Sequence, residues 1–200
     1  MRFFNEQPVI KVSARMARLK FIECGPKCIA TGCTAKCCDA PTRPTGMFVH
    51  ILPEEEDSLL TIFGARVRDG LLLPKDDTSS GCPFKTNKHL CRLHLTSRKP
   101  FGCTVSPFAL NKSGTLIIRN RYKLLPCYDK DFGLPAYHTF KTSLQMLFGN
   151  GYETLKIHLD TGGGDRLMPI HQSMLDKLTD IQNDMERHSK DGQKRISKGA

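Results

Sequence analysis

The 200-residue sequence contains no apolar run long enough to cross a bilayer. Its longest apolar runs, such as residues 71–73 and 116–118, are short, whereas a membrane-spanning helix needs about 20 apolar residues. The first residues also lack the apolar stretch of a secretory signal, because Asn5, Glu6 and Lys11 interrupt them. These absences predict a protein without a membrane partner that resides in the reducing cytoplasm.

Signatures of catalysis are also missing. Gly162, Gly163 and Gly164 resemble part of a phosphate-binding loop, but they lack the lysine and hydroxyl residue that complete one, so we expect a linker there. The acids at positions 54–57 are explained by the start of a helix, where negative charge is favourable. The catalytic residues, if the protein is an enzyme, are therefore unknown from the sequence, which leaves open whether it is one.

Acidic residues are outnumbered by basic ones, 20 against 30, which gives a formal net charge of +10. This charge favours an anionic partner, either nucleic acid or an acidic protein surface. The candidate nucleic-acid residues are Arg98, Lys99, Arg119, Arg121 and Lys123. The last three alternate along a predicted strand and would share one of its faces, for which a solvated sheet face is the alternative explanation.

Cysteine, in contrast, is abundant: the chain has nine, and five of them lie within residues 24–38. Thiolates clustered on a short loop are typical of tetrahedral zinc or iron sites. A disulfide framework is less favoured, because the count is odd and the chain is long enough to build its own core. The candidate metal ligands are Cys24, Cys28, Cys33, Cys37, Cys38, Cys82, Cys91, Cys103 and Cys127.

The order of these cysteines and their neighbours is informative. After the loop that closes in the pair Cys37 and Cys38 come Gly81-Cys82-Pro83-Phe84, Cys91-Arg92-Leu93-His94, Arg98-Lys99-Pro100-Phe101-Gly102-Cys103 and Pro107. Over about residues 24–128 this order resembles the YkgJ-type cysteine-cluster family, a zinc- or iron-chelating domain named for its CxxCxxCC motif. The cysteines of the loop are more widely spaced than in that motif, and His94 stands where tyrosine is usual.

Two kinds of metal centre are compatible with this donor set. Eight thiolates fill two tetrahedral zinc sites, which we favour because the short successive gaps of ferredoxins are absent. An iron–sulfur cluster is the alternative, and the family resemblance implies it equally. His94, between Cys91 and Cys103, is an additional candidate ligand, and which eight of the nine cysteines bind is left open.

The fold class expected from these patterns is α+β: a small, irregular, metal-stabilised cysteine-cluster domain with a β-hairpin, followed by a helical extension. The expected segments are an N-terminal stretch over residues 1–23, the metal-binding domain over 24–128, the helical extension over 129–188 and a basic, flexible tail over 189–200. The expected elements are a strand over 48–52, a helix from Pro53 closed by Gly70, a hairpin of 105–110 with 115–125 that turns at 111–114, and helices over 137–148 and from Pro169 to about His188.

Together these features predict a metal-binding module for binding or assembly, with the C-terminal helices as the docking surface for a protein partner. The alternative is an enzyme or enzyme subunit that uses an iron–sulfur centre for redox or modification chemistry.

Overall fold

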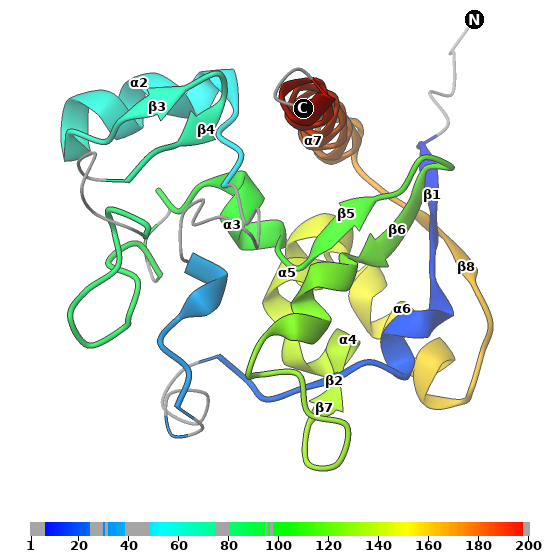
Figure 1. Ribbon diagram of the computed structural model, residues 1–200. Helices are drawn as coiled ribbons and strands as arrows, with labels where there is room; N and C mark the ends of the chain where they lie inside the picture. Colours follow the sequence, from blue (N-terminus) through cyan, green and yellow to red (C-terminus); the bar gives the residue numbers. More distant parts are fainter. Residues whose placement is uncertain are drawn as a thin grey trace, which may run out of the picture.

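The computed structural model describes residues 7–24, 30, 32–38, 49–74, 81–94, 96 and 98–197, with Cys38 and residues 188–197 described in their backbone only. These residues form a mixed α+β fold (Figure 1). The strands are β1 (Val9–Val12), β2 (Lys20–Phe21), β3 (Val67–Arg68), β4 (Leu71–Leu72), β5 (Phe108–Leu110), β6 (Thr115–Ile118), β7 (Leu134–Pro135) and β8 (Arg166–Pro169). The helices are α2 (Pro53–Phe63), α3 (Phe101–Val105), α4 (Ala136–Thr139), α5 (Lys141–Phe148), α6 (Gly151–Asp160) and α7 (Gln172–Ser197), with the 3-10 helices η1 (Ala14–Ala17), η2 (Lys36–Cys38) and η3 (Asn120–Leu124).

The main sheet has the strand order β5-β6-β1-β8. Its β5–β6 pair confirms the predicted hairpin, because the two strands are antiparallel and Asn111 organises the turn between them. The Asn111 side-chain oxygen accepts hydrogen bonds from the backbone N–H groups of Ser113 (3.0 Å) and Thr115 (2.9 Å). The return strand ends at Ile118 rather than at Leu125, since the chain turns there into η3.

The N-terminal segment supplies an inner strand of this sheet. β1 pairs in parallel with β6 and antiparallel with β8, so both of its edges are hydrogen-bonded. Ile10 and Val12 on its inner face are buried, at 4% and 1% exposure. Their burial places β1 at the centre of the fold.

A large hydrophobic core joins this sheet to the C-terminal helices. Leu116 of β6 packs in one cluster with Leu144 of α5, Leu155 of α6 and Leu178 of α7. Figure 1 shows α5 and α6 beside the β5–β6 hairpin. Residues on both sides of position 128 therefore contribute to the same core, and the helical extension packs as part of the main body.

The predicted helix over residues 137–148 is divided into α4 and α5. Phe140, which separates them, has φ −107° and ψ 34°, outside the helical region. The hydroxyl of Thr139 donates to the carbonyl of Phe21 (3.0 Å) and thereby ties the end of α4 to β2.

A second, smaller hydrophobic cluster lies around α2, β3 and β4, at the left of Figure 1. Pro53 occupies the first turn of α2, as expected, and acidic residues follow it. The helix ends at Phe63 because Gly64 adopts a left-handed conformation (φ 58°), so the predicted extension to Gly70 is wrong. Of the strand predicted over residues 48–52, position 48 lies outside the described residues, and His50 makes only an isolated bridge with Leu71.

The long helix α7 connects the two clusters. Its buried side chains Leu178 and Ile181 belong to the main core, whereas Asp184 lies 3.0 Å from Nδ1 of the buried His50, next to the second cluster. Lys177 also forms an ion pair with Glu54 of α2 (3.0 Å). Because these contacts reach both clusters, α7 fixes their relative positions.

Helix α7 is also longer than expected. Its backbone remains helical to Ser197 instead of ending near His188, where a flexible tail was predicted. The lysines, glutamine and arginine of this stretch have high helix propensity, and extending an existing helix costs far less than starting one. Among the described residues, no helix has the length and apolar character needed to cross a membrane.

Candidate metal site

Cys24 lies just after β2, in a segment that runs beside Cys127. The backbone N–H of Ile22 donates to the carbonyl of Cys127 (2.8 Å), and Phe21 forms an isolated bridge with Tyr128. These contacts bring the chain near Cys24 alongside Cys127, although the two cysteines are far apart in the sequence.

The thiol of Cys24 is hydrogen-bonded to that of Cys37. This hydrogen bond is the main reason why the pKa of Cys24 is lowered to about 6; Lys99 acts in the same direction, whereas partial burial and Glu23 oppose the shift. A thiol with such a pKa is mostly ionised at neutral pH, which is the form that binds metals. Cys37 and Cys127 each pack against the main core.

Cys82 and Cys91 form a second pair on a short turn that resembles a hairpin. The backbone N–H of Lys85 donates to the carbonyl of Cys82 (3.0 Å), that of Arg92 donates to the carbonyl of Phe84 (2.9 Å), and Lys85 and Cys91 form an antiparallel bridge. The two cysteines are half-buried and line one small hollow. They also pack against the second hydrophobic cluster.

Residues 32–38 lie next to both cysteine pairs. Ala35 lines the hollow that holds the second pair, and Cys37, two positions later, contacts Cys24. Figure 1 shows η2 below α3, between the α2 region and the main sheet. One short segment of the chain therefore touches both places where cysteines come together.

The donor chemistry suits zinc and iron, but a tetrahedral site needs four ligands. Where side chains are described, no three or more His, Cys, Asp or Glu residues are grouped as a metal site. Each cysteine pair brings together two of the four donors that a tetrahedral site would need. Of the other predicted ligands, Cys33 is buried (5% exposed) and Cys103 lies in α3, whereas Cys28 and the side chain of Cys38 lie outside what the structure describes.

The additional candidate His94 is exposed and follows Cys91 in a turn. Its backbone N–H donates to the carbonyl of Cys91 (3.2 Å). This bond places the backbone of His94 near the second pair, and its role as a ligand stays a prediction.

The basic residues predicted to share a strand face do not share one. Arg119 follows the last residue of β6, and Arg121 and Lys123 lie in η3. Arg119 is 8% exposed and donates from Nη2 to Oγ of Ser106 (2.6 Å). Burial and the neighbouring Arg119 lower the pKa of Arg121 to about 10.

The other two basic candidates lie near the cysteines and α2. Lys99 is close enough to Cys24 to lower its pKa, and the exposed Arg98 lies 6.0 Å from the ring centroid of Phe63. The five basic residues are thus distributed over different environments, and the strand face predicted for Arg119, Arg121 and Lys123 is not formed.

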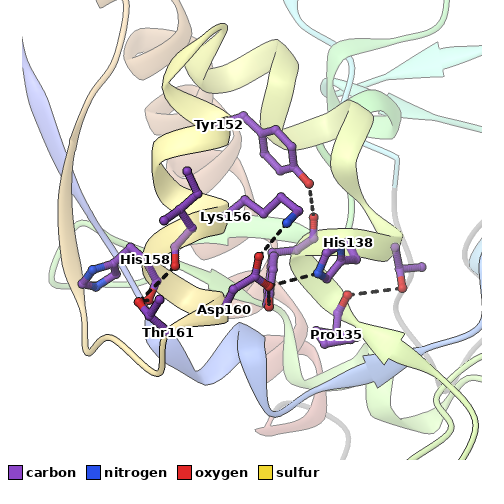
Figure 2. Close-up of polar contacts among 10 residues, drawn as sticks. Pro135, His138, Tyr152, Lys156, His158, Asp160 and Thr161 are labelled. Carbon is purple, nitrogen blue, oxygen red and sulfur yellow. Dashed lines mark hydrogen bonds and ion pairs between the residues drawn. The ribbon is translucent and has the colours of Figure 1, made fainter.

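A polar network that was not predicted from the sequence is centred on Asp160 at the end of α6 (Figure 2). Lys156 (2.6 Å), the hydroxyl of Tyr137 (2.5 Å) and Nε2 of His138 (3.2 Å) all contact its carboxylate. Lys156 and then Tyr137 are the main causes that lower the pKa of Asp160 to about 2. Only the spacing of Lys156 and Asp160, four residues apart in a helix, is visible in the sequence. Because its oxygens are used in contacts with α4 and α6, we assign Asp160 a structural role.

Comparison with known proteins gives no assignment. No family model, no curated protein and no solved structure matches the chain.

Proposed function

We propose that this protein is a metal-binding cysteine-cluster protein that acts as a binding or assembly module. Its thiolates would hold about two zinc ions, with an iron–sulfur cluster as the alternative centre. The observation that carries the proposal is the contact of residues 32–38 with both cysteine pairs, through Ala35 on one side and Cys37 on the other. The order of the cysteines, which resembles that of the YkgJ-type family, supports the same proposal.

Each pair has a feature that favours metal binding. The lowered pKa of Cys24 makes the thiolate available at neutral pH without a strong base. Cys82 and Cys91 are fixed by backbone hydrogen bonds of their turn, so less conformational entropy is lost when an ion binds. Residues 32–38 and 81–94 contain little regular secondary structure, and bound metal would stabilise their conformation.

The partner in this proposal is anionic, because the chain carries a net charge of +10. An acidic protein surface is favoured over nucleic acid, since Arg119 is buried and the predicted row of basic side chains along one strand is not formed. An enzymatic role would require the iron–sulfur alternative, for which metal analysis is the direct test.

The test is elemental analysis of the full chain purified without oxygen. We expect a colourless protein with about two zinc ions per chain. A brown protein that contains iron and labile sulfide would favour the iron–sulfur cluster over zinc. A protein that contains neither metal would refute the proposal.

Substitutions locate the ions. Cys82→Ser and Cys91→Ser should each lower the zinc content by about one ion per chain, because each removes one of four ligands from a single tetrahedral site. His171→Ala is the matched control: His171 is exposed and bonds to Ser173 (2.7 Å), so this variant should keep its full zinc content. Equal zinc in the cysteine variants and the control would contradict a site at this pair.

A further inference from the structure

Cys24 differs in accessibility from the other predicted ligands whose side chains the structure describes. Cys24 is an exposed residue whose thiol is hydrogen-bonded to that of Cys37. Cys33, between them in the sequence, is buried, and Cys82 and Cys91 are both half-buried in their hollow. Among the cysteines whose side chains are described, Cys24 is therefore the most open to a small oxidant from solvent, and a second thiol is already hydrogen-bonded to it.

We propose that Cys24 and Cys37 are a redox-active pair that a hydroperoxide converts into a disulfide. The sulfur of Cys24 attacks one oxygen of the peroxide, the O–O bond breaks, and Cys24 becomes a sulfenic acid while the other oxygen leaves as water. The sulfur of Cys37 then attacks the sulfenic sulfur, the S–S bond forms, and the hydroxyl leaves as a second water. Two thiols and one hydrogen peroxide thus give one disulfide and two waters.

Two features of the chain favour this reaction. The hydrogen bond between the thiols brings the resolving sulfur close to the attacked one, so the second step is intramolecular and fast. The backbone bond from Ile22 to Cys127 (2.8 Å) holds the segment before Cys24 in place, so the pair does not depend on a chance encounter.

Oxidation would also change the metal content, and this consequence rests on the proposed function. A disulfide removes two thiolates from whatever ion Cys24 and Cys37 hold, and a site that loses two of four ligands releases its metal. The pair would therefore couple the oxidant level to the stability of one metal site and leave Cys82 and Cys91 unaffected.

The sequence allows the linkage to be mapped directly. Trypsin cleaves after Lys20, Lys27 and Lys36, so Cys24 is alone in the peptide of residues 21–27, and the peptide that starts at Cys37 is separate from both Cys28 and Cys33. The full chain is treated with about one equivalent of hydrogen peroxide, unreacted thiols are alkylated, and the digest is examined by mass spectrometry.

We expect an intact monomer that is lighter by about 2 Da, reverts with dithiothreitol, and yields the peptide of residues 21–27 joined to the peptide that starts at Cys37. Cys37→Ser should abolish this joined peptide, and Cys38→Ser, the matched control at the adjacent cysteine, should retain it. Linkage of Cys24 to another cysteine, a disulfide between Cys82 and Cys91 in its place, or overoxidation of Cys24 without linkage would each overturn the proposal.

Zinc released into a chromogenic chelator is measured in the same sample. Release of about one ion with the joined peptide supports both proposals. The joined peptide in a protein that never contained metal supports the redox pair and contradicts the metal-binding function. Zinc in the starting sample without the joined peptide contradicts the redox pair alone.

Discussion

Gly102→Ala perturbs the closest approach between the cysteine-bearing helix α3 and the chain that precedes α2. A Cβ atom at position 102 would lie 2.6 Å from the carbonyl oxygen of His50, and 3.5 Å and 3.6 Å from its carbonyl carbon and nitrogen. The atom that it meets belongs to the backbone, so no side-chain rotation relieves the contact. His50 is further fixed by its bridge with Leu71 and by the contact between its ring and Asp184 of α7 (3.0 Å).

Two opposing effects set the size of the change. Alanine is favoured over glycine within a helix by about 1 kcal/mol. Overpacking costs about 1–3 kcal/mol, and a contact with fixed backbone belongs at the upper end of that range. The cost of the clash therefore exceeds the gain in helix propensity, and we expect Gly102→Ala to lower the free energy of unfolding by about 2 kcal/mol.

Urea unfolding followed by circular dichroism measures this difference. For a chain of this size a loss of about 2 kcal/mol corresponds to a decrease of roughly 4–8 °C in Tm. Gly164→Ala is the matched control, because a Cβ at position 164 meets nothing within 4 Å, and the variant should be as stable as the parent or slightly more stable. If the two variants have the same stability, the close packing of α3 on His50 is not present in solution.

Two carboxylates give further predictions. Glu55→Ala removes the acceptor for the N–H groups of Phe101 (2.6 Å) and Leu52 (3.0 Å) and should lower the free energy of unfolding by about 2–4 kcal/mol in urea titrations, whereas Glu56→Ala should change it little. Burial raises the pKa of Glu55 above its ordinary value of 4.5, so the part of its contribution that depends on protonation is complete below pH 4.5 and is lost as the pH rises through the folded-state pKa. The hydrogen bonds from Phe101 and Leu52 do not require the proton, and Glu55→Gln should flatten only the pH-dependent part of the profile. Asp160 should stabilise the fold over the opposite pH range, because its pKa is lowered from 3.8 to about 2. The difference in Tm between the parent and Asp160→Asn should be full above pH 3.8 and should vanish as the pH falls through about 2. A difference in Tm that persists at lower pH would contradict the ionic contacts.

Local signals in the sequence predicted the local parts of the fold. Pro53 and the acids after it specify the start of α2, and Asn111 specifies the hairpin turn through its own side-chain hydrogen bonds. The central position of β1 has no such local signal, because it depends on pairing with β6 and β8, both distant in the sequence. The buried state of Arg119 escaped prediction for the same reason: its hydrogen-bond partners are on the other side of the hairpin, at Ser106 and Pro107.

The positions of the cysteines also depend partly on local and partly on long-range contacts. The contact of Cys24 with Cys37 and the turn that joins Cys82 to Cys91 each arise within a short stretch of chain, where the spacing of cysteines is a useful guide. The approach of Cys127 to Cys24 depends instead on the bond between Ile22 and Cys127, and no motif encodes it. Spacing therefore indicates that thiols cluster, whereas long-range backbone contacts decide which distant cysteines lie beside them.

The position of the two pairs suggests why metal would matter to this fold. Cys37 and Cys127 pack on the main core, whereas Cys82 and Cys91 pack on the smaller cluster around α2. The regions are linked by α7, whose Lys177 and Asp184 contact Glu54 and His50, and by α3, where the N–H of Phe101 donates to Glu55 of α2. The segment of residues 32–38 is a further link between them. An ion bound at either pair would stiffen that segment, because closing a loop around fixed ligands removes conformations from the unfolded chain. Metal binding would then act on the orientation of one cluster relative to the other, in addition to the stability of each.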